Sequence, residues 1–233
     1  MSDQLPDLFK CFDQGTAERP FVVAQLGQSL DGRIATLTGD SKYINRAAAL
    51  DHLHRIRAHV DAVVVGIGTV IADDPLLTVR RVEGPSPARV VIDPRGRLPS
   101  TSKCLADDGT PRFVIRCKDG PAPPGVESIR LEAEGTLAPD AIVRALAERG
   151  MRRILVEGGA RTISAFIDAR ALDRLHVMVA PLLLGSGKPA LDLKPIGALS
   201  EALRPTARTY LLSDGDVLFD CDMRRLAHEG AAA

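Results

Sequence analysis

The chain has 233 residues, of which 45% are hydrophobic and only 3% aromatic, with no tryptophan. Its 30 basic and 30 acidic residues give a formal net charge of zero, whereas a nucleic-acid-binding domain usually has a marked basic excess. No stretch approaches the roughly 20 apolar residues of a membrane span, so we expect a cytoplasmic protein with neither nucleic acid nor membrane as a partner.

The first half of the chain predicts alternating strands and helices. Residues 1–19 are polar without a clear period, and we expect them to form a flexible lead-in. Asn45 is a candidate N-cap for a helix that runs to about residue 59. Short β-branched apolar runs predict four strands, over residues 21–26, 61–66, 89–93 and 112–116.

The second half continues this alternation and ends in a hairpin. We expect helices over residues 139–150 and 158–172, strands at 153–157 and from Leu175, and a hairpin of 207–212 with 216–222. This order predicts an α/β fold, with a mostly parallel central sheet, helices on both faces and an antiparallel C-terminal hairpin. We expect a single domain over residues 20–224 and a disordered tail over 225–233.

Cysteine and histidine positions give no sign of a metal site. The four cysteines form no C-x-x-C pair, and we interpret them as reduced thiols. The five histidines do not converge in sequence as three or four ligands would, so we interpret them as solvent-facing or packing residues.

Three loops that follow predicted strands suggest a small-molecule site. Glu157-Gly158-Gly159-Ala160 turns on glycines into a helix, whose N-terminus suits a phosphate; the alternative is a tight turn without a ligand. Gly66–Thr69 and Ser29–Arg33 also follow strands, and carboxyl ends of parallel strands meet at one edge of a sheet. Asp73 and Asp74 before a proline are typical of a turn or cap, and Arg80 beyond them suits a phosphate or carboxylate.

Five stretches together resemble a known family. They are RPFVVAQLGQSLDGRIA (19–35), RIRAHVDAVVVGIGTVIADDPLLTVR (55–80), ARVVIDPRGRLP (88–99), ILVEGGARTISAFI (154–167) and VAPLLLGSGKP (179–189). In this order they are similar to the reductase half of the bacterial riboflavin-pathway deaminase/reductase. The resemblance is continuous over residues 19–189 and looser over the final strands.

The resemblance implies a dihydrofolate-reductase-like fold and an NADPH-dependent enzyme that is commonly a homodimer. Such enzymes reduce the ribose C1′ of a 5-amino-6-(5-phosphoribosylamino)uracil-type intermediate to the ribitylamino form. The H-x-E and P-C-x-x-C signatures of the zinc deaminase half do not occur, so the chain resembles the reductase alone.

The resemblance also assigns site residues by position. The implied cofactor contacts are Gly27, Tyr43, Thr69, Asp73, Gly158, Gly159, Ala160, Arg161, Thr162 and Ile163. The implied substrate contacts are Gln25, Ser41, Arg57, Leu77, Arg80 and Glu157. Arg57 and Arg80 would bind the phosphate of the ribose chain. Asp73, or a water that it holds, is the candidate for proton handling, and Arg95 or Arg97 is a candidate for the cofactor 2′-phosphate.

Two positions depart from the family pattern. Tyr43 stands where a tryptophan is common, which preserves a ring that can pack against the cofactor. Gln25 stands where a lysine is usual, so a neutral amide replaces a positive charge that would bind a carbonyl of the pyrimidine. The alternative function is therefore a related NADPH-dependent reductase of a pterin or other heterocycle. A non-catalytic nucleotide-binding protein is a third hypothesis.

Overall fold

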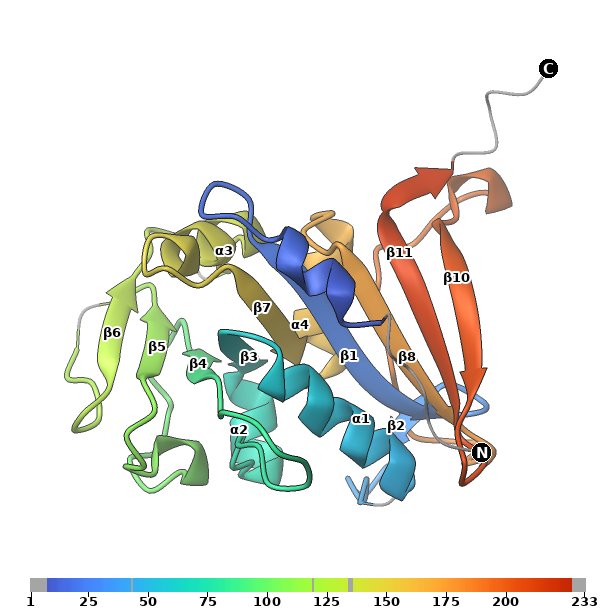
Figure 1. Ribbon diagram of the computed structural model, residues 1–233, viewed down its shortest axis with the longest axis horizontal. Helices are drawn as coiled ribbons and strands as arrows, with labels where there is room; N and C mark the ends of the chain where they lie inside the picture. Colours follow the sequence, from blue (N-terminus) through green and yellow to red (C-terminus); the bar gives the residue numbers. More distant parts are fainter. Residues whose placement is uncertain (1–7, 43, 119, 134–135, 228–233) are drawn as a thin grey trace.

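A nine-stranded sheet runs through the molecule in the order β10-β11-β8-β1-β7-β3-β4-β5-β6 (Figure 1). The computed structural model describes residues 8–42, 44–118, 120–133 and 136–227. The strands are β1 Phe21–Ser29, β3 Ala62–Gly66, β4 Ala88–Ile92, β5 Arg112–Arg116, β6 Glu127–Arg130, β7 Arg153–Glu157, β8 Arg174–Ala180, β10 Arg204–Leu211 and β11 Val217–Ala227. Strands β8, β1, β7, β3, β4, β5 and β6 are parallel, whereas β11 runs antiparallel to both β8 and β10.

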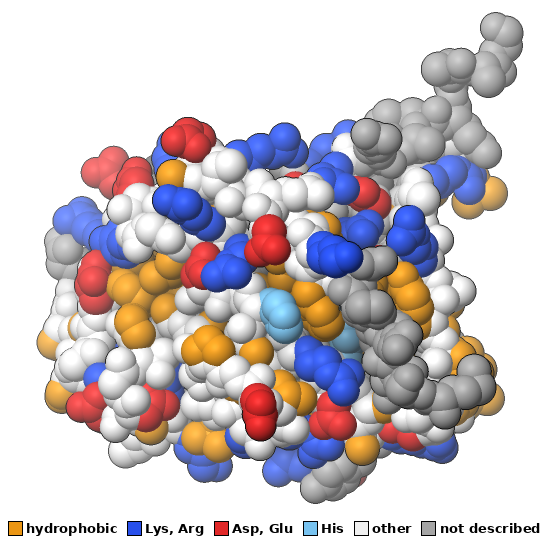
Figure 2. All heavy atoms as spheres, viewed as in Figure 1, with side chains coloured by type: hydrophobic (Ala, Val, Ile, Leu, Met, Phe, Trp, Pro, Cys, Tyr) orange, Lys and Arg blue, Asp and Glu red, His pale blue; other side chains and the backbone are white. Residues whose placement is uncertain are grey.

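Helices cover both faces of the sheet, as the sequence predicted. One face carries α1 Ala47–Ala58, α2 Ile67–Asp73 and the 3-10 helix η1 Lys10–Gln14; the other carries α3 Pro139–Ala147 and α4 Ala160–Asp168. Two short 3-10 helices are η2 Lys103–Leu105 and η3 Leu199–Glu201, and β2 Arg33–Ala35 pairs with β9 Lys188–Pro189 in a separate small sheet. Figure 2 shows basic and acidic side chains interspersed over one face of the molecule, in keeping with its zero net charge.

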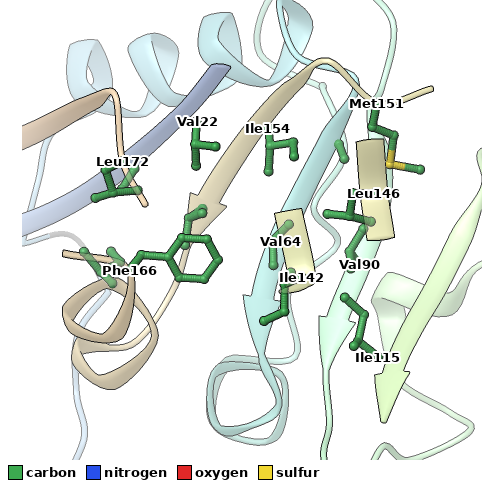
Figure 3. Packing of buried hydrophobic residues seen from close by; sticks show 14 of the residues in the cluster. Val22, Val64, Val90, Ile115, Ile142, Leu146, Met151, Ile154, Phe166 and Leu172 are labelled. Carbon is green, nitrogen blue, oxygen red and sulfur yellow. The ribbon is translucent and has the colours of Figure 1, made fainter. Parts of the chain in front are cut away.

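The alternation of side chains along the strands divides the core into two layers. The layer under α3 and α4 contains Val22 of β1 and Ile154 of β7, packed against Ile142 and Phe166 of the helices (Figure 3). Next to each of these strand residues, Val23 and Leu155 point to the opposite face, under α1 and α2. Continuing this period places Gln25, in the middle of β1, and Glu157, at the carboxyl end of β7, on the face of α1 and α2.

The prediction that Asn45 caps α1 is wrong. Arg46 rather than Asn45 is the N-cap residue, and its side chain makes no capping bond. The carboxylates of Asp216 and Asp214, in the turn between β10 and β11, instead accept the backbone N–H groups of Arg46 and Ala48, both at 2.8 Å. The Asn45 side-chain amide donates to Asp216 at 3.2 Å. A distant turn therefore satisfies the free donors at the start of α1.

The described part of the expected lead-in is packed against the sheet rather than loose. Leu8 and Phe12 are buried, and the Phe9 ring stacks on His59 of α1 with centroids 4.6 Å apart. Burial of these large apolar side chains holds the segment against the sheet, although most of its other residues are polar. The expected tail overlaps β11, which extends to Ala227; residues 228–233 lie outside the described residues.

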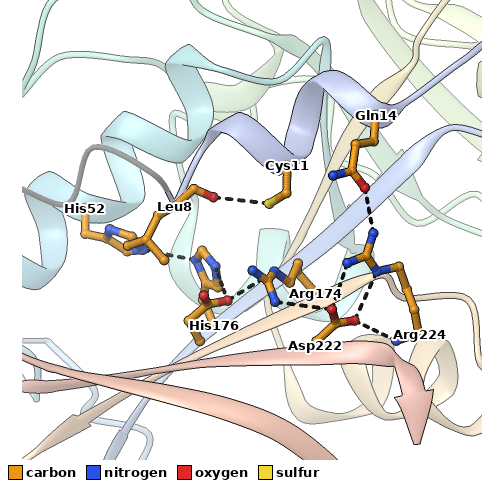
Figure 4. A network of polar contacts seen from close by, with 9 residues as sticks. Leu8, Cys11, Gln14, His52, Arg174, His176, Asp222 and Arg224 are labelled. Carbon is orange, nitrogen blue, oxygen red and sulfur yellow. Dashed lines mark hydrogen bonds and ion pairs between the residues drawn. The ribbon is translucent and has the colours of Figure 1, made fainter.

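A polar network anchors this N-terminal segment to the hairpin side of the sheet (Figure 4). Arg224 of β11 donates to the Gln14 side chain at 2.6 Å and pairs with Asp222 at 2.7 Å. Beneath η1, the fully buried rings of His52 and His176 lie 3.1 Å apart between Nε2 and Nδ1. Burial and the neighbouring His176 lower the pKa of His52 well below its usual range, so this ring is neutral at physiological pH.

Candidate functional site

A cleft of about 1030 Å³ opens at the carboxyl ends of the central parallel strands. It lies where the chain leaves β3 and the adjacent β7 toward opposite faces, through α2 and α4 respectively. Such a switch point is the usual ligand site of an open α/β sheet. The cleft is lined by the ends of β1, β3, β4 and β7, by α2 and α4, and by the small β2–β9 sheet.

Two glycine turns line this crevice, as the sequence predicted for the loops after β3 and β7. Gly158 has a φ of +108°, and a Cβ atom there would lie 2.7 Å from Oγ1 of Thr69. The same hydroxyl accepts the backbone N–H of Gly159 at 2.7 Å, which joins α2 to the start of α4. The expected loop Gly66–Thr69 is instead the start of helix α2, with Gly66 as the N-cap.

The N-terminus of α4 presents free hydrogen-bond donors to the cleft. Among the described residues, the backbone N–H groups of Ala160 and Arg161 have no acceptor, because the first helical bonds begin at Thr162. Ala160, Arg161 and Thr162 all line the cleft. Free N–H groups and the positive end of the helix dipole can hold a phosphate here.

A buried ion pair stands at the end of β7. Nε and Nη2 of Arg57 donate to Oε1 and Oε2 of Glu157, both at 2.7 Å, and the two side chains are 6% and 10% exposed. Nη1 of Arg57 donates to the Thr78 carbonyl at 3.1 Å. Glu157 lines the cleft, whereas Arg57 lies behind it. All three nitrogens of the Arg57 guanidinium therefore donate hydrogen bonds within the protein itself.

Other predicted substrate residues lie on the same face. Gln25, 9% exposed, and Ser41 line the cleft. Since Ala24 of β1 pairs with Val156 of β7, Gln25 and Glu157 follow on neighbouring strands with side chains on one face. Arg80 has an exposed side chain, and Glu157 lies close enough to influence its pKa. The Gln25 amide and the Glu157 carboxylate thus lie together in the cleft lining, whereas Arg80 is near Glu157 but is not one of the lining residues.

The remaining predicted cofactor residues are placed less uniformly. Gly27, Thr69 and Asp73 line the cleft, Asp73 as an exposed carboxylate at the end of α2, and Arg95 and Arg97 line it beyond β4. Ile163 is fully buried in the core and Leu77 is 1% exposed, so neither reaches the cleft. Tyr43 lies outside the described residues.

The third predicted loop, Ser29–Arg33, is not part of the cleft lining. Its carboxylate, Asp31, accepts the Ser29 hydroxyl at 2.6 Å and the backbone N–H groups of Leu184 and Gly185 at 3.1 and 2.6 Å. These hydrogen bonds, that of Ser29 foremost, lower the pKa of Asp31 to about 2. The loop instead fixes the segment that leads into β9.

Several lining residues were not identified from the sequence. Lys188 and Asp192 come from the segment around β9, Phe166 from α4 and Thr136 from the loop before α3. The GSGKP motif of the resemblance contains Lys188 and was the available signal. The others reach the cleft only through the tertiary fold.

The described residues contain no group of three or more histidine, cysteine or acidic side chains arranged to hold a metal ion. Within the same residues, no helix has the length and apolar character needed to cross a membrane.

Comparisons with known proteins agree on one family. A family model described as the RibD C-terminal domain matches residues 20–209. The riboflavin biosynthesis protein RibD of Aquifex aeolicus is 35% identical over 195 residues, which cover 81% of this chain and 54% of that protein. The 2,5-diamino-6-ribosylamino-4(3H)-pyrimidinone 5′-phosphate reductase of Methanothermobacter thermautotrophicus is 34% identical, with coverage of 84% and 95%. The chain thus spans about half of the RibD protein but nearly all of the archaeal reductase.

Solved structures agree on the fold. The Saccharomyces cerevisiae riboflavin biosynthesis reductase superposes with a TM-score of 0.79 at 23% identity, covering 97% of this chain and all of that one. Dihydrofolate reductase from Enterococcus faecalis superposes with a TM-score of 0.51 at 12% identity, covering 87% and 95%. The expected dihydrofolate-reductase-like fold is confirmed.

Proposed function

The chain belongs to the RibD C-terminal domain family, and from this membership we propose that it is an NADPH-dependent reductase of riboflavin biosynthesis. Its substrate is a 5-amino-6-(5-phosphoribosylamino)uracil-type intermediate, which it converts to the ribitylamino form. The observation that carries this proposal is a single cleft lined both by the start of α4, whose free N–H groups suit a phosphate, and by the polar side chains of Gln25 and Glu157. The name of the archaeal relative, a reductase of a ribosylaminopyrimidinone phosphate, supports the same substrate class.

The cleft fits a nicotinamide dinucleotide phosphate. The free N–H groups at the start of α4 suit the pyrophosphate, and Gly158 allows Thr69 of α2 to approach the turn that precedes these groups. Arg95 and Arg97 lie beyond β4 in the same cleft, where a guanidinium suits the 2′-phosphate that distinguishes NADPH from NADH. When bound, the cofactor would supply the hydride that reduces C1′.

The chain's own residues orient the acceptor for this transfer. The ring-opened aminoribose presents an imine-like C1′, so the reaction requires alignment and exclusion of water more than covalent catalysis. Gln25 and Glu157 would bind polar edges of the pyrimidine, and Arg80 would bind the phosphate of the ribose chain. Asp73, an exposed carboxylate on the cleft wall, would hold the water or proton needed at the reduced centre.

A second candidate substrate is a pterin or another heterocycle. Gln25 favours this alternative, because a buried neutral amide, 9% exposed, occupies the position at which the family pattern usually has a lysine. An amide offers both a donor and an acceptor, so it can recognise a different pattern of ring substituents from that bound by an ammonium group.

The test is NADPH oxidation by the purified protein with three substrates: the amino-pyrimidinone ribosyl phosphate, the corresponding uracil and a pterin. We expect turnover with one of the first two and none without the ribosyl group. Turnover of the pterin alone would select the second candidate, and NADPH binding without turnover of any substrate would refute a reductase. We also propose that the protein forms a homodimer and is located in the cytoplasm.

A further inference from the structure

The segment Leu77–Arg80, which follows α2, is held in place by side chains rather than by strand pairing. It belongs to no helix or strand, yet the Thr78 carbonyl accepts Nη1 of Arg57 at 3.1 Å and the Val79 N–H donates to Oγ of Ser86 at 3.0 Å. The N–H of Arg80 donates to Nδ1 of His54 at 3.1 Å. Three consecutive residues therefore each have a backbone group bound to a side chain.

Two of these bonds come from one face of α1, which lies beside the segment (Figure 1). His54 and Arg57 are three residues apart, a spacing that places both on the same side of a helix. Together they bind a carbonyl and an N–H two residues apart, as a neighbouring strand would. Leu77 anchors the other end of the segment, 1% exposed and with a φ of +59°. A left-handed non-glycine residue persists only where its surroundings impose it.

His54 is suited to this single bond. The side chain is 2% exposed, and Nδ1 accepts an N–H, which requires a ring without a proton on that atom. Burial and the neighbouring guanidinium groups, that of Arg57 foremost, lower the pKa of His54 to about 4. The ring therefore stays an acceptor throughout the physiological range.

The bond from the Arg80 N–H to His54 would control the position of the Arg80 side chain. Among the described residues, its guanidinium has no hydrogen-bond or ion-pair partner. Burial and the guanidinium groups of Arg57 and Arg81 lower the pKa of Arg80, so its cation stands in a basic corner that favours an anion. A free cation on a segment without secondary structure needs an external support to keep one position.

We infer that His54 is a positioning residue, which fixes the backbone of Arg80 so that the Arg80 guanidinium meets the phosphate of the substrate. The inference rests on the proposed function for the identity of that phosphate. His54 itself contacts neither the proposed substrate nor the cofactor. It acts through Arg80, and the competing explanation is that it only packs in the core.

The test compares His54→Leu, which removes the acceptor, with His54→Asn, which can return an acceptor oxygen near the position of Nδ1. We expect His54→Leu to raise KM for the phosphorylated substrate about tenfold, the size of one lost hydrogen bond, with kcat within about twofold. The Asn variant should recover most of this loss. In an Arg80→Ala background, His54→Leu should change KM by less than about twofold, because the residue through which it acts is gone.

His59→Leu is the matched control. His59 lies at the exposed end of α1 and its ring stacks on Phe9, so its loss perturbs the helix without touching the Leu77–Arg80 segment. It should leave KM unchanged. An equal rise in KM in the Arg80→Ala background, or no recovery in a folded Asn variant, would overturn the inference and leave a packing role.

A binding measurement separates this inference from the proposed function. Calorimetric titration with ribose 5-phosphate should show the same tenfold weakening in His54→Leu, and ribose should show no difference between the proteins. This holds even if no reductase substrate is found. Equal affinity of wild type and His54→Leu for ribose 5-phosphate would refute the role of His54 while leaving the reductase untouched.

Discussion

The buried pair of Arg57 and Glu157 provides the sharpest prediction about what holds the site together. Both oxygens of the carboxylate accept from the fork at 2.7 Å, and neither side chain is more than 10% exposed. In Glu157→Leu, the guanidinium remains buried behind the cleft without its counter-charge. Arg57→Met leaves the carboxylate buried in the same way and also removes the bond to the Thr78 carbonyl.

Removing one member of a buried ion pair costs about 3–5 kcal/mol, mainly because the other charge stays desolvated. For a chain of this size each kcal/mol lowers Tm by roughly 2–4 °C, so each single variant should lose roughly 6–20 °C. The double variant Arg57→Met/Glu157→Leu removes both charges, and it should be more stable than the sum of the single losses predicts, by about 2 kcal/mol or more.

Urea unfolding followed by circular dichroism measures these free energies. The exposed pair of Arg81 and Asp51 is a matched control, with a single contact at 2.6 Å and side chains 36% and 32% exposed. Removing either of its partners should cost no more than about 1 kcal/mol. If Glu157→Leu costs no more than the control, or if the losses in the double variant are additive, the ion pair does not stabilise the site.

Three further predictions test the glycine turn, the buried His54 and the substrate. Gly158→Ala should lower Tm, because φ is +108° and the new Cβ would meet Thr69 at 2.7 Å. It should also weaken NADPH binding, measured by fluorescence titration, because this clash would shift the start of α4; unchanged binding would exclude a role of the turn in holding the cofactor. The pKa of His54 is about 4 when folded and 6.5 when unfolded, so the unfolded chain binds more protons between these values. The contribution of His54 to the free energy of unfolding should therefore fall by up to about 3 kcal/mol as pH drops from 6.5 to 4, and His54→Asn should make the pH dependence shallower in urea titrations at each pH. If Gln25 excludes the pyrimidine, Gln25→Lys should gain turnover of the uracil intermediate in an NADPH assay; equal turnover by the wild type would remove the pterin alternative.

The layered fold could be predicted because its strands are short apolar runs separated by helices, and binary patterning determines such a sheet. Strand β6 could not be predicted, since only Ile129 of its four residues is apolar and the strand lies at the edge of the sheet. The cap of α1 could not either, because Asp214 and Asp216 approach it from the far end of the chain.

The part of the candidate site that could be predicted is the pair of glycine turns at strand ends. The turns at Gly66 and Gly158 line the cleft, because parallel strands bring their carboxyl ends together whatever the helices do. Which polar side chain faces the ligand depends on packing that a motif does not contain. Arg57 is engaged by Glu157, Leu77 is buried, and His54, set aside as a packing residue, supports the backbone of Arg80.

In the proposed reaction, hydride passes from NADPH to C1′ of a ribosylaminopyrimidine phosphate in this cleft. NADPH deuterated at the transferable position, incubated with the protein and the uracil or pyrimidinone intermediate, tests it directly by mass spectrometry and NMR of the product. We predict a ribitylamino product that carries the deuterium at C1′. Unreduced substrate, or deuterium on the heterocyclic ring instead of the sugar carbon, would contradict it.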